Sequence, residues 1–65
     1  MKITFDKEAD AAYIYFKEIL KGEIFQTVSL NDNVNIDLDK KGRTLGIEIL
    51  NASSKLPQET LRLAS

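Results

Sequence analysis

Apolar and polar residues alternate along most of this chain, with the period of two that a β-strand with one buried face requires. The alternation predicts strands over residues 2–5, 11–17, 24–30, 34–39 and 44–50. Polar or glycine-containing segments separate these stretches, as expected for turns. The pattern therefore predicts an antiparallel β-meander of four to five strands, with one apolar and one polar face.

The second of these segments has a helical alternative. Residues 7–20 contain Ala, Glu, Lys and Leu, which are good helix formers. The run Tyr13-Ile14-Tyr15-Phe16 nevertheless combines aromatic and β-branched residues with period two, which favours a strand. As a strand, it places Tyr13 and Tyr15 on the polar face.

The alternation stops after Leu50. Residues 51–54 predict a turn, and Pro57 suits the first position of a helix over residues 58–63. A helix of barely two turns is not stable alone in water, so it is expected to pack on one face of the sheet. The chain is therefore predicted to be a single α+β domain, residues 1–65, with one short C-terminal helix.

Matching apolar with apolar residues predicts the register of the last three strands, because a slip by one residue would expose every apolar side chain. The expected pairs on the apolar face are Leu38–Leu45, Ile36–Ile47, Val34–Ile49, Leu30–Val34 and Val28–Ile36. The same register opposes Asp39 to Thr44. It gathers around Gly46 the polar residues Thr27, Ser29, Asn35, Asp37, Thr44 and Glu48.

The composition limits the kinds of chemical site that the chain can form. A hydrophobic content of 43% with 29% charged residues is typical of a folded domain. The chain has no Cys and no His, which excludes disulfides, Cys/His zinc sites and nucleophiles activated by His. Its three separated glycines make no phosphate-binding loop. No cofactor is expected.

Charge and hydropathy limit the kinds of binding partner that the chain is expected to have. Nine basic against ten acidic residues give a net charge of −1, which provides no field towards nucleic acid or anionic membranes. No apolar run approaches the roughly 20 residues that span a bilayer, and the first residues lack the apolar segment of a secretory signal. A cytoplasmic protein without membrane contact is expected.

Small size favours self-association. A chain of 65 residues buries only about 60% of its unfolded surface, so disulfides, metals or oligomerisation usually assist it. With the first two poorly supported, a homo-oligomer is expected. Aromatic side chains are enriched at protein interfaces, and the interaction candidates are Tyr13, Tyr15, Phe25 and Leu50.

Three carboxylates are weaker candidates for a metal site: Asp37, Asp39 and Glu48. Together with Gly42 they match the spacing of a calcium-binding loop at its first, third, sixth and twelfth positions. Lys41, however, stands where the fifth position needs an oxygen ligand, and the flanks alternate as strands. A hairpin turn is the favoured interpretation.

A basic turn formed by Lys40, Lys41 and Arg43 is the candidate for nucleic-acid binding. Three exposed charges at a turn are more often only solvated, and the neighbouring strands are acidic. Nucleic acid is therefore not the favoured partner.

Several blocks of the sequence together resemble a known family. They are residues 6–11, Tyr13-Ile14-Tyr15, Asp37-Leu38-Asp39 followed by Gly42, residues 46–50, and Ala52-Ser53. Over residues 2–53 the chain resembles the small prokaryotic family catalogued as domain of unknown function 2283. The resemblance implies a self-contained domain without an assigned activity. It also implies a partner of small toxin-like proteins, as an antitoxin or regulator, and it supplies no catalytic residue.

The favoured function is a small non-catalytic protein-interaction or oligomerisation module, whose partner is a second copy or a small toxin-like protein. Two alternatives stay open. One is a divalent-metal-binding or carboxylate-based enzyme that uses the polar face of the sheet. The other is nucleic-acid binding through the basic turn.

Overall fold

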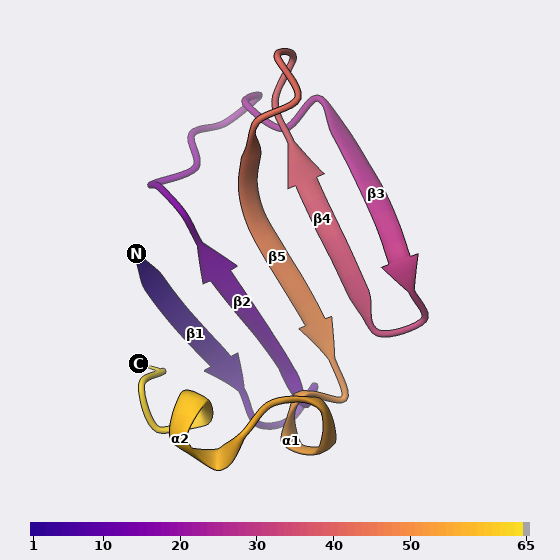
Figure 1. Ribbon diagram of the computed structural model, residues 1–65. Helices are drawn as coiled ribbons and strands as arrows, with labels where there is room; N and C mark the ends of the chain where they lie inside the picture. The colour runs from indigo at the N-terminus through magenta and orange to yellow at the C-terminus, as the bar shows by residue number, and fades with distance from the viewer. Residues whose placement is uncertain (65) are drawn as a thin grey trace.

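The computed structural model describes residues 1–64 and shows one antiparallel sheet with two short helices at one end (Figure 1). Its elements are β1 (Lys2–Asp6), β2 (Ala11–Tyr15), β3 (Gln26–Asn31), β4 (Val34–Leu38), β5 (Thr44–Leu50), α1 (Ala52–Lys55) and α2 (Gln58–Leu61). The predicted α+β class with an antiparallel five-stranded sheet is confirmed. Neither helix of the described residues is long and apolar enough to cross a membrane.

The strand order is β1-β2-β5-β4-β3, so the predicted meander holds for the pair β1–β2 and for β3, β4 and β5, but not between β2 and β3. A continuous meander would pair β2 with β3, whereas β2 pairs with β5. The reason is the segment of residues 16–25, which carries the chain past the ends of β5 and β4 to the far edge (Figure 1). Alternation assigns residues to faces but does not decide which strands are neighbours.

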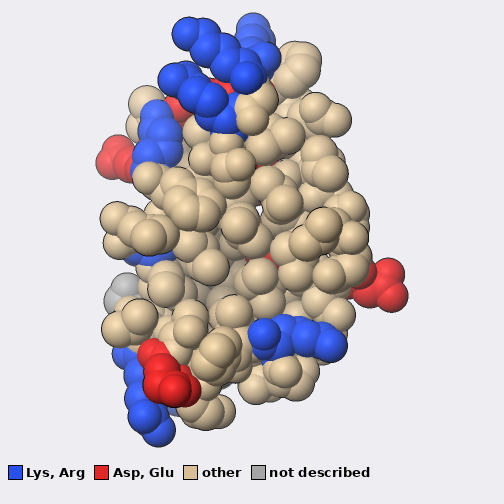
Figure 2. All heavy atoms as spheres, viewed as in Figure 1, with Lys and Arg blue, Asp and Glu red and all other residues tan. Residues whose placement is uncertain are grey.

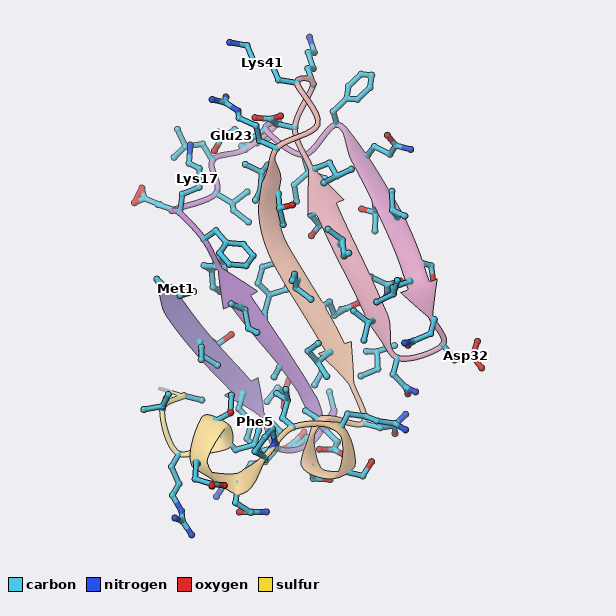
Figure 3. The ribbon with its side chains drawn as sticks, in the orientation of Figure 1. Met1, Phe5, Lys17, Glu23, Asp32 and Lys41 are labelled. Atoms are coloured by element: carbon cyan, nitrogen blue, oxygen red, sulfur yellow. The ribbon has the colours of Figure 1, made fainter. Side chains whose placement is uncertain are left out.

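Residues 16–25 are held by their own contacts. For this reason β2 ends before the predicted residue 17, and β3 begins after the predicted residue 24. The backbone N–H of Phe16 still donates to the carbonyl of Leu45, and regular pairing then stops. Glu23 closes the loop, because its carboxylate accepts from Lys17 Nζ at 2.6 Å and from the backbone N–H of Leu20 at 2.8 Å. Lys17 and Glu23 lie together at this end of the sheet (Figure 3).

The predicted register is correct over most of each ladder, including the pair Val34–Ile49, and wrong at one end of each. Ile36 opposes Ile47, and Val28 opposes Ile36, as predicted. Two bulges change the rest. Leu38 lies opposite Thr44 instead of Leu45, and Asn31 rather than Leu30 lies opposite Val34. The predicted pair Asp39–Thr44 is wrong for the same reason. A bulge inserts one residue into a strand, and apolar matching alone assumes that none is inserted.

One row of β-branched side chains crosses the apolar face through every strand. We call it the central row; its members, from β1 to β3 across the sheet, are Ile3, Ile14, Ile47, Ile36 and Val28. Figure 2 views the face that carries the helices: the spheres over its middle are almost all tan, blue spheres lie across its lower part, and the other charged spheres lie at the ends and sides. None of the five central-row side chains is buried.

The helices cover only the end of the apolar face below the central row. There Ala12, Ile49 and Ala52 are buried, and Leu56 and Leu61 pack against them. Phe5 joins this cluster and lies beside the helices in Figure 3. The prediction of one helix over residues 58–63 is corrected to two helices of four residues each, because the expected turn at residues 51–54 forms most of α1.

Candidate functional site

The polar face is organised around Asp37 on β4. Its carboxylate accepts a hydrogen bond from the Tyr13 hydroxyl and another, at 2.5 Å, from Thr27 Oγ1. Thr27 lies directly opposite on β3, as the predicted register requires. Tyr13 comes from β2, two strands away, so its ring extends across β5. Hydrogen bonds to a charged acceptor are the strong ones, and these two join three strands, β2, β4 and β3.

Gly46 makes this reach possible. It is buried in the middle of β5, opposite Tyr15 on one side and Asp37 on the other. A Cβ at this position would overlap the ring of Tyr13, which therefore occupies the space that a side chain would take. An aromatic ring laid over a strand glycine covers backbone that would otherwise be exposed. The requirement at Gly46 is thus close approach rather than unusual dihedral angles.

The environment of Tyr13 also fixes its protonation state. Partial burial, the hydrogen bond to Asp37 and the negative charges of that carboxylate and of Glu48 all disfavour the phenolate, and burial is the largest cause. The pKa of Tyr13 is therefore raised well above its ordinary value of about 10. At neutral pH this phenol is a hydrogen-bond donor and cannot act as a base.

The predicted interaction candidates occupy different surroundings. Tyr13 and Tyr15 contact each other with ring centroids 4.6 Å apart, and Lys2 Nζ lies 5.5 Å from the centre of the Tyr15 ring. Leu50, at the end of β5, is half-buried opposite Ala11. Phe25 is 65% exposed, immediately before β3. Of the four, Phe25 alone is a large and freely accessible apolar side chain.

The three metal candidates lie in separate hydrogen-bonded groups. Glu48 accepts from Asn35 Nδ2 at 3.0 Å, while Asp37 is engaged as described above. Asp39 lies in the turn after β4, where its carboxylate accepts from Arg43 Nε at 2.7 Å and from two backbone N–H groups. Residues 1–64 contain no group of three acidic, His or Cys side chains able to hold a metal ion.

The basic turn lies at the opposite end of the sheet from the helices. Lys40 and Lys41 are exposed there, and Figure 2 shows blue spheres gathered at this end. Arg43 belongs to the same turn, but its guanidinium is paired with Asp39. The backbone N–H and the guanidinium of Arg43 hold the pKa of the Asp39 carboxyl below its usual range, the backbone contact being the larger cause.

One contact joins two blocks of the family pattern that lie far apart in the sequence. Asp10, at the end of the β1–β2 turn, accepts hydrogen bonds from the Ser53 backbone N–H at 2.9 Å and from Ser53 Oγ at 2.8 Å. The Asp10 carbonyl also accepts from the Ala52 N–H. Asn51 provides no side-chain cap, so Asp10 caps α1 from the other end of the chain. Both residues belong to the blocks that carry the family resemblance, but nothing in the sequence indicates that they are in contact.

A hollow of about 370 Å³ lies between the start of β1 and the segment after β2. It is lined by Met1, Lys2, Tyr15, Lys17, Glu18 and Ile19. The two lysines already have partners, since Lys2 lies over the Tyr15 ring and Lys17 pairs with Glu23. The lysines that line the hollow are therefore engaged elsewhere, and we assign it no ligand.

The remaining candidate is the apolar face itself. The central row stands at the middle of a sheet, a position that two-layered domains bury. Above it Phe16 is 46% exposed, and at its edge Val28 is 39% exposed. The alternation of the sequence placed these residues on one face, but their exposure depends on how little of that face the two short helices cover.

Two comparisons with known proteins found no match: no curated protein and no solved structure is similar enough to this chain to be informative. A comparison with family models did find one. The model described as a protein of unknown function (DUF2283) matches residues 2–53, which include all five strands and the Asp10–Ser53 contact. The chain therefore belongs to the DUF2283 family of proteins of unknown function.

Proposed function

We propose that this chain is a non-catalytic protein-interaction module, which uses the apolar face of its sheet to dock another protein surface. The observation that carries the proposal is the central row. Its five β-branched side chains form an unbroken line across the sheet; Val28 is exposed and the other four are only half-buried.

The dimensions of the chain support this proposal. A compact domain of this length has a radius of gyration of about 10.7 Å, whereas this chain has 11.8 Å. Its smallest extent is 18 Å, close to one sheet with a partial second layer. Contiguous apolar surface of this kind on a small domain marks interaction sites.

The polar face supports the non-catalytic part of the proposal. Asp37 is engaged by two donors, Glu48 by Asn35, and Asp39 by the turn that contains Arg43. Tyr13, the phenol nearest these carboxylates, stays protonated. These side chains satisfy one another, which is how a polar surface contributes to folding rather than to chemistry.

The experiment is a measurement of molar mass by light scattering after size-exclusion chromatography. The chain is run alone and mixed with the product of the neighbouring reading frame, which tests a toxin-like partner. A mass above 7.3 kDa for the chain alone, or a mixed species heavier than either protein run separately, supports the proposal. A mass of 7.3 kDa for the chain alone and two separate, unshifted species in the mixture, at concentrations up to hundreds of micromolar, contradict it.

A matched pair of variants connects the association to the face. Val28 and Ser29 are neighbours on β3 and, by the strand period, belong to opposite faces. Val28→Lys is expected to abolish the complex, whereas Ser29→Lys leaves it intact. If both variants associate like the unmodified chain, the apolar face is not the docking surface.

A further inference from the structure

We infer that the surface docked on the apolar face is a second copy of this chain, packed face to face with its helices at the opposite end. The inference rests on the proposed function and specifies its partner. It follows from the area that the monomer leaves exposed, from the absence of charge in the central row, and from the position of the helices.

The exposed area has the size that a dimer needs. A compact monomer of 7.3 kDa has an accessible surface of about 4,200 Å², and this chain has 4774 Å². The excess is roughly 600 Å² per copy. Two such faces bring together about 1,200 Å², the lower limit of the range for specific interfaces. Contact between two copies would thus bury the excess accessible surface, and no additional helix or strand is needed to cover it.

The face is complementary to itself. The central row carries no charge, and neither do the strand residues below it, which are Phe5, Ala12, Ile49 and Val34. Above the row, Phe16 and Leu38 continue the apolar surface, while Leu45 is buried. In a symmetric dimer the same patch meets itself, so a charged face would repel its copy. The central row itself therefore brings only aliphatic groups together.

The helices decide the relative orientation. They form a step over one end of the face, where Leu56 and Leu61 pack, and the other end is open. A two-fold axis along the strands would place helices on helices and keep the sheets apart. A two-fold axis along the central row places each helical step over the open end of the other copy. Two sheets pack about 10 Å apart, which is also the diameter of a helix.

In this arrangement each residue of the central row faces its own counterpart, so Val28 faces Val28 of the second copy. Val28→Lys then brings two ammonium groups together in an apolar interface. Like charges juxtaposed in an interface repel each other, and the dissociation constant is expected to rise at least about a hundredfold. Ser29→Lys, on the other face of the same strand, is expected to leave it within about threefold.

The first test measures the mass of the chain alone. Twice 7.3 kDa for the unmodified chain and for Ser29→Lys, with one chain mass for Val28→Lys, supports the inference. If both variants dissociate, the copies join through the edge of β3 rather than through the face, and the inference fails. If the chain alone is a monomer but binds the neighbouring gene product, the inference fails while the proposed function stands.

The second test measures the orientation and does not depend on how well Val28→Lys folds. The chain has no native cysteine, so Lys41→Cys provides one spin label per copy at the tip of the β4–β5 turn. With the helices at opposite ends, the two labels are separated by a distance on the order of the 33 Å length of the chain. A separation of about 20 Å or less would place both tips at the same end and overturn the proposed geometry.

Discussion

Replacing Gly46 by alanine tests the contact at the centre of the polar face. In an ordinary strand this change is favourable, because glycine costs roughly 0.5–1 kcal/mol relative to alanine. Here the new Cβ would overlap the ring of Tyr13. The ring must then move, and the hydrogen bond from its hydroxyl to Asp37 is lost. The sign of the effect therefore reports whether the ring lies over Gly46.

The magnitude follows from these two contributions. A hydrogen bond to a charged group contributes about 1.5–3 kcal/mol, and the backbone gain from alanine offsets part of this loss. We expect Gly46→Ala to lower the free energy of unfolding by about 1–2 kcal/mol. For a domain of this size that corresponds to a fall in Tm of roughly 5–15 °C. Circular dichroism during heating, at one fixed protein concentration, measures it.

The control is the same change in a chain that carries Tyr13→Ala. With the ring removed, Gly46→Ala no longer meets an obstacle and is expected to raise the stability by roughly 0.5–1 kcal/mol. The two backgrounds thus form a double-mutant cycle, and opposite signs measure the coupling between the residues. A stabilising effect of Gly46→Ala in both backgrounds would show that the Tyr13 ring does not cover this glycine in solution.

Three further predictions concern single groups. Asp10→Gly removes both hydrogen bonds to Ser53, and glycine tolerates the φ of 51° observed at this position. Thermal unfolding should show that the free energy of unfolding falls by about 1 kcal/mol. An unchanged Tm would contradict the capping role. The raised pKa of Tyr13 means that its stabilisation is complete below pH about 10 and is lost as pH rises through the folded pKa. Above pH about 10, the Tm of the unmodified chain should therefore fall more steeply with pH than the Tm of Tyr13→Phe. Equal slopes of Tm against pH in the two chains would refute this. The lowered pKa of Asp39 means that its stabilisation is present above about pH 4 and is lost as pH falls through the folded pKa. Arg43→Ala removes the guanidinium but keeps the backbone N–H, so carboxyl NMR should give Asp39 a lower midpoint in the unmodified chain than in Arg43→Ala. Identical midpoints would exclude an effect of the guanidinium.

The faces of the sheet could be predicted from the sequence, whereas the order of its strands could not. Alternation with period two fixes which side chains share a face, because a slip of one residue exposes them all. It placed Thr27 opposite Asp37 and Asp37 opposite Gly46, and the structure confirms both pairs. The connection of residues 16–25 is long enough to reach either edge of the sheet, and the cost of closing a loop changes little with its length.

The Tyr13–Asp37 contact depends on that order. In a continuous meander β2 would lie next to β3, and Tyr13 would be too far from Gly46 to cover it. Because β2 pairs with β5, Tyr13 lies opposite Glu48 and reaches diagonally over Gly46 to Asp37. The Asp10–Ser53 contact likewise joins residues 43 positions apart in the chain. Contacts between strands that are distant in sequence are the part of the site that a local pattern cannot provide.

The polar groups on one face of this sheet have partners within the chain, whereas much of the apolar face is left uncovered. This difference is the reason for assigning the proposed docking to the apolar face. From the sequence alone, exposed tyrosines on the polar face are the strongest indication of a partner. In the structure, Tyr13 is engaged by Asp37 and covers Gly46, while Tyr15 contacts Tyr13 and Lys2. Removing those groups from their present partners for a new one would cost the hydrogen bonds already made. The central row has no such partners to lose, so covering it yields the larger gain in free energy, at about 25 cal/mol for each Å² of apolar surface buried. A second surface is therefore expected to bind where the chain leaves apolar groups unpaired, not where its polar groups already satisfy one another.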